Sequence, residues 1–191
     1  DEEQRPVSVI FAVRSIEYEK RKEEQLLRSS TTDELTRCYN RRAYEQDIKK
    51  LTADKKFLYL SADVNGLKAV NDRLGHAAGD ELLCGVAGCM KQSFEDYGKV
   101  YRIGGDEFVT ILFTDEEQFG IIKQNFDLLV DNWSGDTVPH MSVSCGAVWS
   151  DERQWESVRE IAKLADQRMY EKKAKHYARR KSDFQNWMYK R

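Results

Sequence analysis

Long hydrophobic runs are missing from this chain of 191 residues. No apolar segment approaches the ~18–20 residues that a helix needs to cross a bilayer, and no signal-peptide pattern is visible. We therefore expect a cytoplasmic location and no direct membrane contact by this stretch of chain. The sequence does not begin with Met, which predicts a piece of a longer protein.

Paired cysteines are also absent. The four cysteines form no CxxC motif and have no histidine partner at metal-ligand spacing; they are Cys38, Cys84, Cys89 and Cys145. This pattern favours buried free thiols in a reducing compartment over a disulfide or a zinc site.

An excess of positive charge is missing as well, because 31 Lys and Arg stand against 33 Asp and Glu, for a net charge of −2. Proteins that bind nucleic acid by neutralising its phosphates need a basic surface, so we expect no nucleic-acid partner. An anionic small molecule is compatible with this charge if a metal ion or a few lysines neutralise it locally. The length and the 40% of apolar residues suit one α/β domain with a core.

The hydrophobic pattern predicts alternating helices and strands. Strands are expected at 7–13, 57–64 and 141–149, a hairpin over 100–113, and helices at 15–29, 40–51, 66–75 (a short turn), from 80 onward, 119–130 and 158–177. This order predicts an α+β domain with a mainly antiparallel sheet and flanking helices, related to the ferredoxin-like βαββαβ plan.

The predicted hairpin has an unusual apex in the stretch YRIGGDEFVTILF, residues 101–113. Gly104 and Gly105 suit a two-residue primed turn, which needs positive φ angles. Asp106 and Glu107 follow on the outgoing strand, where successive side chains point to opposite faces. One acid can then face a ligand; the alternative is a solvated hairpin tip.

A third acid, Asp63, closes the apolar strand 57–64. If this strand neighbours the hairpin, Asp63 converges with Asp106 and Glu107, and carboxylates that close repel one another unless a cation lies between them. Carboxylate oxygens together with a main-chain carbonyl are ligands that Mg²⁺ takes. The sequence therefore predicts a magnesium site.

The segment after Asp63 offers a place for phosphates. Gly66 and Leu67 begin a turn with outward N–H groups, and Lys68 lies in its first turn. This suits an anion, although the Walker pattern GxxxxGK[ST] is absent.

Three polar residues follow on the same segment. Asn71 together with a carboxylate such as Asp80 can read the edge of a guanine base, and His76 lies between them. Helix caps at Asn71 and Asp80, and a turn residue at His76, are the structural alternatives. A carboxylate at Asp80 favours guanine over adenine, because it would repel the N1 lone pair of adenine.

Five blocks in a fixed order resemble the GGDEF domain of diguanylate cyclases. They are LTRCYNRR, DVNGLKAVNDRLGHAAGDELL, YRIGGDEF, MSVSCGAV and ADQRMYEKK, and they span most of the chain. The resemblance implies a palm-like fold of nucleotidyl-cyclase type at 31–180. It further implies a signalling enzyme that condenses two GTP molecules into cyclic di-GMP and pyrophosphate, as a homodimer with one GTP in each monomer.

The resemblance also implies roles for single residues. Metal ligands for Mg²⁺, with Mn²⁺ as an alternative, would be Asp63, the carbonyl of Val64, Asp106 and Glu107. Substrate-binding residues would be Gly66, Leu67, Lys68, Asn71, His76, Asp80 and Lys173. Asp106, Glu107 and Lys68 would be the catalytic residues, with Asp106 placed to accept the proton of the 3′-hydroxyl.

Several positions depart from the family pattern. Asn65 stands where an Asp is frequent, Arg37 where a glycine is usual, and Tyr177 where an Arg often follows the lysine of the last helix. An aromatic residue common in the 66–67 turn is also absent. An inhibitory product site would need Arg and Asp at positions that hold Glu95 and Gly98, so we predict no feedback inhibition through that site.

Two other functions are compatible with the same residues. One is a GGDEF-like module, weak or inactive in catalysis, that binds GTP or cyclic di-GMP and regulates a partner; the other is a polymerase-like nucleotidyl transferase, which here lacks a basic groove for a template. Residues 1–30 resemble the last strand of a PAS-type sensor domain and a signalling helix, and an arbitrary linker is the alternative. Residues 181–191 are expected to be a tail.

Overall fold

A computed structural model describes residues 17–20, 22, 30–52 and 54–188. The helices and strands are, in chain order, β1 (Tyr39–Asn40), α2 (Arg41–Ile48), β2 (Leu58–Val64), α3 (Leu67–Leu74), α4 (His76–Phe94), β3 (Gly98–Arg102), β4 (Glu107–Leu112), α5 (Glu116–Asn132), β5 (Val143–Trp149) and α6 (Val158–Met188). The strand predicted at 7–13 lies outside the described residues. So does most of the helix predicted at 15–29, of which residues 17–20 and 22 are helical.

The strands form one five-stranded sheet in the order β1-β3-β4-β2-β5. All neighbours are antiparallel except β1 and β3, which are parallel. The α+β fold with a mainly antiparallel sheet is therefore confirmed, and β2-α4-β3-β4-α5-β5 supplies the βαββαβ core. The sequence did not predict β1, because two residues are too few to produce a periodic pattern.

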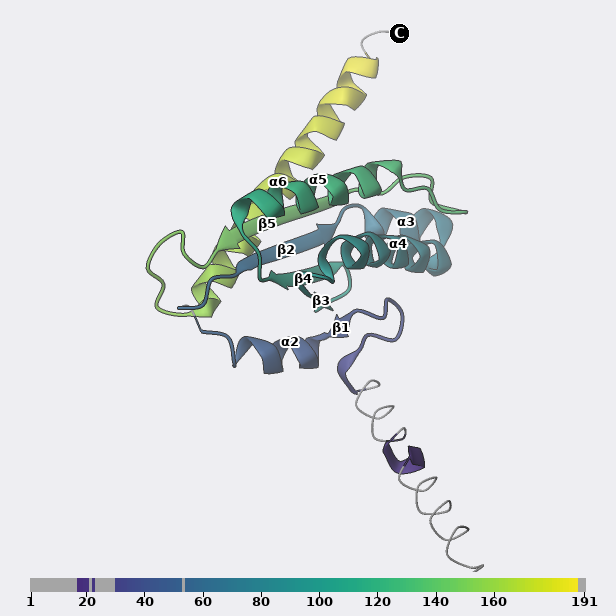
Figure 1. The fold of residues 1–191 in the computed structure, drawn as a ribbon. Helices are drawn as coiled ribbons and strands as arrows, with labels where there is room; N and C mark the ends of the chain where they lie inside the picture. The colour runs from purple at the N-terminus through teal and green to yellow at the C-terminus, as the bar shows by residue number, and fades with distance from the viewer. Residues whose placement is uncertain (1–16, 21, 23–29, 53, 189–191) are drawn as a thin grey trace, which may run out of the picture.

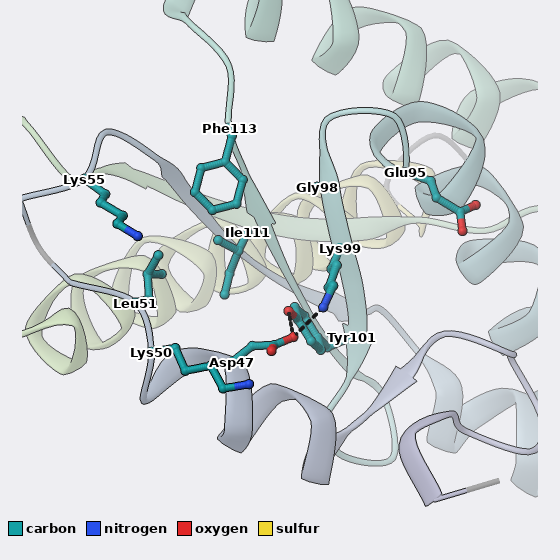
Figure 2. A pocket seen from close by; sticks show the side chains of 10 residues that line it. All are labelled: Asp47, Lys50, Leu51, Lys55, Glu95, Gly98, Lys99, Tyr101, Ile111 and Phe113. Carbon is teal, nitrogen blue, oxygen red and sulfur yellow. Dashed lines mark hydrogen bonds and ion pairs between the residues drawn. The ribbon is translucent and has the colours of Figure 1, made fainter. Parts of the chain in front are cut away.

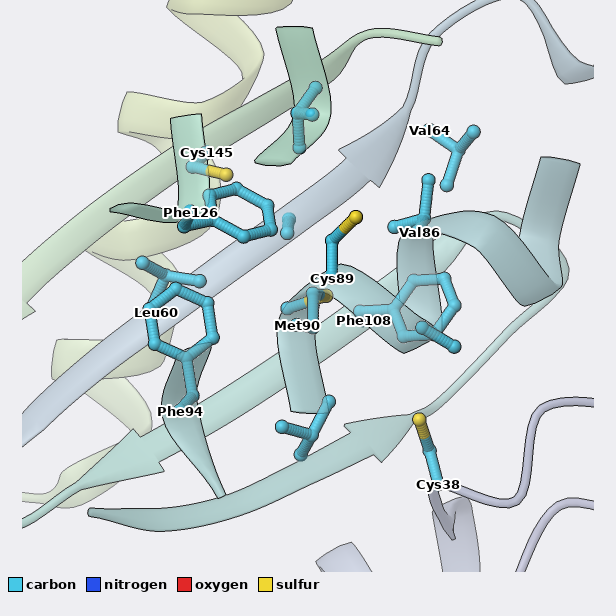
Figure 3. Close-up of a cluster of buried hydrophobic side chains, with 14 of the residues drawn as sticks. Cys38, Leu60, Val64, Val86, Cys89, Met90, Phe94, Phe108, Phe126 and Cys145 are labelled. Atoms are coloured by element: carbon cyan, nitrogen blue, oxygen red, sulfur yellow. The ribbon is translucent and has the colours of Figure 1, made fainter. Parts of the chain in front are cut away.

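Helices cover both faces of the sheet, and each face has its own core. Helices α4 and α5 pack on one face, where the core includes Leu60, Val86, Phe94, Phe108 and Phe126 (Figure 3). Helices α2 and α6 cover the other face (Figure 1), where the core includes Tyr59, Tyr101, Val109, Val148 and Ile161. Every residue of the inner strand β2, which lies between β4 and β5, is buried, and this explains its largely apolar sequence. Alternation along β2 places Leu60 on the α4 side and Tyr59, Ser61 and Asp63 on the α6 side.

Two glycines with positive φ set the bounds of α3. Gly66 (φ 79°) precedes α3, and Gly75 (φ 86°) separates it from α4. The turn predicted at 66–75 is therefore a helix of two turns, and α4 begins at His76 rather than at Asp80. The predicted start of α4 was too late because the apolar residues that mark its buried face in the sequence begin further along the helix. The last helix also continues past the predicted residue 177, and its C-terminal part extends away from the sheet (Figure 1).

All four cysteines are free thiols. Cys38, Cys89 and Cys145 are buried, as expected, but Cys84 is exposed, so the prediction was wrong for this residue. It lies on the outer side of α4, with its sulfur 3.6 Å from the carbonyl oxygen of Leu35. Across the described residues, the structure contains no helix of the length and apolarity that a bilayer crossing requires.

Candidate nucleotide and metal site

The hairpin between β3 and β4 has a longer loop than the sequence suggested. The Ile103 N–H donates to the Glu107 carbonyl oxygen at 3.0 Å, and the loop runs from Ile103 to Asp106. Neither Gly104 nor Gly105 has a positive φ, so the predicted two-residue primed turn is wrong. A Cβ at Gly104 would lie 2.9 Å from Oε2 of Glu107, the mobile end of an exposed side chain, so a small shift of that carboxylate would make room for it.

The three acids predicted to bind a metal come from adjacent strand ends. Asp63 on β2 and Glu107 on β4 are register partners, and the Val64 N–H donates to the Asp106 carbonyl oxygen at 3.0 Å. Directly opposite residues have Cβ atoms about 4.5–5.5 Å apart on the same face. The fold thus brings residues that are more than forty positions apart to one edge of the sheet, on the face covered by α6.

Asp63 is the buried member of this group, with only 4% of its surface exposed. Its Oδ2 accepts a hydrogen bond from Lys173 Nζ at 2.7 Å, whereas its Oδ1 is buried without a hydrogen-bond partner. Burial raises the pKa of Asp63; Lys173 opposes this shift, and the charge of Asp106 adds to it. A buried carboxylate with a free oxygen and further carboxylates nearby needs additional positive charge.

These oxygen donors fit a hard divalent cation such as Mg²⁺. The set comprises the free Oδ1 of Asp63, the carboxylates of Asp106 and Glu107, and the carbonyl of Val64. A closed cluster is not preformed, since no three His, Cys, Asp or Glu side chains in the described chain are grouped as metal ligands. The group in contact with Asp63 is instead the ammonium of Lys173.

The start of α3 presents backbone donors beside these acids. Gly66 is the N-cap of α3, in the left-handed conformation, and no side chain caps this end of the helix. The first N–H groups of a helix have no partner within it, and they carry the positive end of its dipole. Lys68 is exposed in the first turn. The Gly66 N–H itself donates to the hydroxyl of Tyr177 on α6 at 3.2 Å.

The pair α3 and α4 carries the residues predicted to read a base. The Asn71 side chain lies against Gly79, where a Cβ would come 1.9 Å from its Oδ1, and that oxygen is buried without a hydrogen-bond partner. Asp80 follows Gly79 directly and is exposed. Neither Asn71 nor Asp80 caps a helix, because the N-caps of α3 and α4 are glycines. His76 is exposed at the first position of α4 rather than in a turn.

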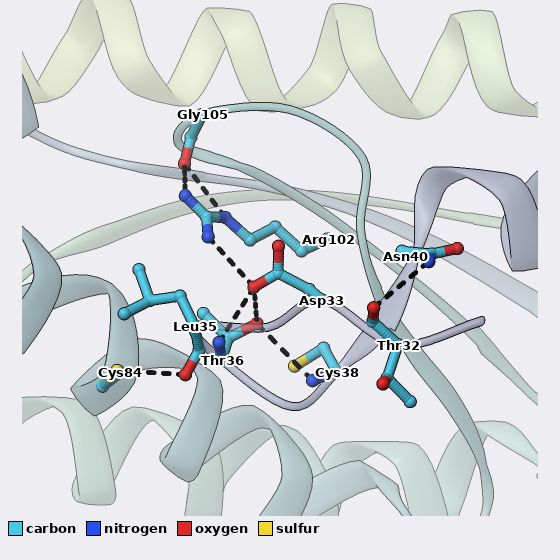
Figure 4. A network of polar contacts seen from close by, with 9 residues as sticks. All are labelled: Thr32, Asp33, Leu35, Thr36, Cys38, Asn40, Cys84, Arg102 and Gly105. Carbon is cyan, nitrogen blue, oxygen red and sulfur yellow. Dashed lines mark hydrogen bonds and ion pairs between the residues drawn. The ribbon is translucent and has the colours of Figure 1, made fainter. Parts of the chain in front are cut away.

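A polar network behind the hairpin loop was not predicted from the sequence. Arg102 donates to the carbonyl oxygen of Gly105 from Nε at 3.2 Å and from Nη2 at 2.8 Å, and its Nη1 contacts Asp33 at 3.0 Å (Figure 4). The same Asp33 oxygen accepts from the backbone N–H and the hydroxyl of Thr36 at 2.8 and 2.7 Å. The loop is therefore tied to the turn at which the domain begins. In the sequence, the signal for this network was Arg102, two residues before the glycine pair.

Two of the departures from the family pattern have local explanations. Asn65 donates to the Ser142 hydroxyl at 3.2 Å and accepts from the Ser144 hydroxyl at 3.0 Å, so it joins β2 to β5 with an amide that both donates and accepts. An aspartate could not donate to Ser142. Arg37 has a φ of 60°, the conformation that favours glycine.

A hollow of about 420 Å³ lies between the end of α2 and strands β3 and β4 (Figure 2). Glu95 and Gly98, which stand where a product site would need Arg and Asp, form part of its wall. Three lysines line it, Lys50, Lys55 and Lys99, and the last of these is paired with Asp47 at 2.8 Å. No arginine lines the described wall of this hollow.

The sheet order, the two helical layers and the acids at the strand ends define a palm-like α+β domain of the nucleotidyl-cyclase type. The family model described as "Diguanylate cyclase, GGDEF domain" matches residues 30–179, and the chain therefore belongs to the GGDEF family.

Named relatives agree with this assignment. The probable diguanylate cyclase DgcI of Escherichia coli (strain K12) is 36% identical over 148 residues, which are 76% of this chain and 31% of the relative. A diguanylate cyclase of Vibrio cholerae is 30% identical over 157 residues, 78% of this chain and 49% of the relative. Over the first relatives compared, the chain spans 24% to 49% of their length.

Solved structures show the same fold. The coiled coil and GGDEF domain of DgcB from Caulobacter crescentus, in complex with c-di-GMP, has a TM-score of 0.71 at 21% identity, over 86% of this chain and 91% of that one. The diguanylate cyclase SiaD from Pseudomonas aeruginosa, in complex with its activator SiaC, has a TM-score of 0.70 at 23% identity, over 87% and 67%.

Proposed function

We propose that this domain is an active diguanylate cyclase that condenses two GTP molecules into cyclic di-GMP and pyrophosphate. The observation that carries the proposal is the pairing of Asp63 with Glu107 in the sheet, beside an oxygen of Asp63 that is buried without a partner. A site built only to stabilise the fold gains nothing from such an oxygen, because burial of an acceptor without a hydrogen bond is costly. Membership of the GGDEF family supports the same activity.

In this proposal, the metal and the phosphates share the edge of the sheet. Asp63, Asp106, Glu107 and the carbonyl of Val64 would hold Mg²⁺, or Mn²⁺ in its place. When bound, the ion supplies charge that offsets the triphosphate and the departing pyrophosphate, which explains how an acidic protein binds this substrate.

The chain's own donors would orient the triphosphate. The N–H groups of Gly66 and Leu67 point from the start of α3, where an anion is favoured. Lys68 would add a cation from the solvent side, and Lys173 one from α6. Lys173 already lies 2.7 Å from Asp63, so it can bridge the carboxylates and the phosphates.

The base would lie along α3 and α4. The unpartnered Oδ1 of Asn71 can accept from the guanine amino group, and Asp80 can accept from N1–H and that amino group. His76, exposed at the start of α4, is placed to contact the same nucleotide. The analogous edge of adenine presents an acceptor at N1, so we expect a clear preference for GTP over ATP.

The reaction needs two copies of the domain, because each would hold one GTP. The 3′-hydroxyl of one nucleotide attacks the α-phosphorus of the other; a new P–O bond forms, the bond to the β-phosphate breaks, and pyrophosphate leaves. Asp106 accepts the proton of the attacking hydroxyl. A second transfer of the same kind closes the ring, so the minimal catalytic unit is a homodimer.

The test is turnover of GTP with Mg²⁺ over a series of protein concentrations, with cyclic di-GMP and pyrophosphate both quantified. We expect two pyrophosphates for each cyclic di-GMP formed, and a specific activity that rises with protein concentration, because dimers form. Asp106→Ala should abolish product, whereas Asp131→Ala, an exposed acid on α5, should not. GTP binding without product at every concentration would refute the enzyme and favour a regulatory nucleotide-binding module.

A further inference from the structure

One contact in the candidate site joins residues that are 111 positions apart. The N–H of Gly66 donates to the hydroxyl oxygen of Tyr177 at 3.2 Å. Tyr177 lies on α6 one turn after Lys173, whose ammonium contacts Asp63 at 2.7 Å. Residues four apart on a helix lie on the same face, so one face of α6 contacts both the acid and the phosphate-binding turn.

This contact uses the donor that a phosphate would need. A backbone N–H has a single hydrogen to donate, and in the left-handed Gly66 it points to the phenol. A phosphate oxygen that accepts from Gly66 must take the place of the Tyr177 hydroxyl oxygen. A phenol is neutral, so it gives this position an acceptor but no positive charge to attract the triphosphate.

We propose that Tyr177 sets the affinity of the site for a nucleoside triphosphate by competing with a phosphate oxygen for the Gly66 N–H. The proposal rests on the nucleotide site described above. Without nucleotide, the phenol oxygen accepts the hydrogen bond of the Gly66 N–H, and a phosphate oxygen can displace it. Binding of the triphosphate breaks this hydrogen bond, and the affinity is lower by the free energy of the contact that is lost.

The surroundings of Tyr177 allow such a displacement. The residue is 39% exposed, so the ring can turn toward solvent without opening the core. Its packing partner is the ring of His176, with centroids 5.4 Å apart in an edge-to-face contact within the same helix. Lys173 keeps its own contact with Asp63 when the phenol moves, because the two side chains bond to different partners.

The test measures binding and stability with the wild type and three variants of the whole chain. The probe is the magnesium complex of guanosine 5′-[α,β-methylene]triphosphate, whose bridging carbon prevents turnover, in calorimetric titrations. Tyr177→Phe should bind it about two- to fivefold more tightly than the wild type, because one neutral hydrogen bond no longer has to be broken. Tyr177→Arg should bind at least as tightly as the Phe variant, since arginine has no acceptor for the Gly66 N–H and adds a cation.

Without nucleotide, Tyr177→Phe should be no more stable to heat than the wild type, so its gain in affinity should come without a gain in stability. Tyr97→Phe is the matched control. It also loses a single hydroxyl contact, from Gln118 at 3.0 Å, but near the end of α4 remote from Gly66, and its affinity should equal that of the wild type.

Two outcomes would overturn the inference. If Tyr177→Phe binds the probe more weakly, the hydroxyl assists the phosphates instead of competing with them; if its affinity is unchanged, the contact is merely structural. The proposed function is judged separately, by whether the wild type binds the guanosine probe and discriminates against its adenosine counterpart. Absence of binding in all the variants would refute the nucleotide site itself, and the role of Tyr177 with it.

Discussion

Removal of the Asp33 carboxylate should destabilise the domain more than its position near the surface suggests. One oxygen of Asp33 accepts from the N–H and the hydroxyl of Thr36 and contacts Arg102, at 2.7 to 3.0 Å. The Arg102 side chain is only 14% exposed and that of Asp33 25%, so solvent screens this pair incompletely. Hydrogen bonds to a charged group contribute about 1.5–3 kcal/mol each, though not additively.

For Asp33→Ala we therefore expect the free energy of unfolding to fall by about 2–4 kcal/mol at pH 7, since Arg102 also loses its counter-charge. Asp33→Asn retains an acceptor for Thr36 but loses the charge, so about half of that loss is expected. Urea unfolding followed by circular dichroism measures both. Asp151→Ala, which removes an ion pair with Lys56 that is about half exposed, is the control and should stay within about 0.5 kcal/mol of the wild type.

The pH dependence gives a second check on the same residue. Burial alone would raise the pKa of Asp33, but the bonds from Thr36 and Arg102 outweigh burial and hold its pKa below the ordinary value of 3.8. A carboxyl whose pKa is lowered by folding stabilises the native state above its unfolded pKa and loses this effect as the pH falls through the folded pKa. The difference between wild type and Asp33→Ala should thus shrink below pH 3.8. A difference under 0.5 kcal/mol at about pH 7, or one that grows on acidification, would refute the reasoning.

Three further outcomes are expected. Gly146→Ala should lower the free energy of unfolding, measured in urea, by about 1–3 kcal/mol, because a Cβ there would lie 2.0 Å from a backbone oxygen of α6. An unchanged urea midpoint would contradict this close packing. Arg37→Gly should raise thermal stability by about 0.5–1 kcal/mol, as it relieves a left-handed conformation at an exposed residue, and a loss of stability would argue against that strain. If the domain is the proposed cyclase, added cyclic di-GMP should not inhibit its turnover through the hollow of Figure 2, because no arginine among the described residues lines that hollow. Inhibition at low micromolar product would contradict this prediction.

The sequence determined the elements whose signals are local. The apolar run at 57–64 predicted a buried strand, and the glycine pair Gly104-Gly105 with strand-forming residues on both sides predicted a hairpin. The acid at the end of one strand and the acids after the glycine pair were enough to suggest a shared cation site. The strand and the hairpin are confirmed, because hydrophobic periodicity over several residues specifies an element and the face it buries. The cation site stays a prediction.

Only the tertiary structure decided the features that depend on distant partners. The two-residue strand β1 exists because β3 pairs with it, and the loop after Arg102 is tied through this arginine to Asp33, far back in the chain. The contact between Gly66 and Tyr177 joins opposite parts of the chain and leaves no periodic trace in either segment. Contacts of this kind are fixed by how helices pack on the sheet, which no local pattern encodes, and in this domain they shape the proposed nucleotide site.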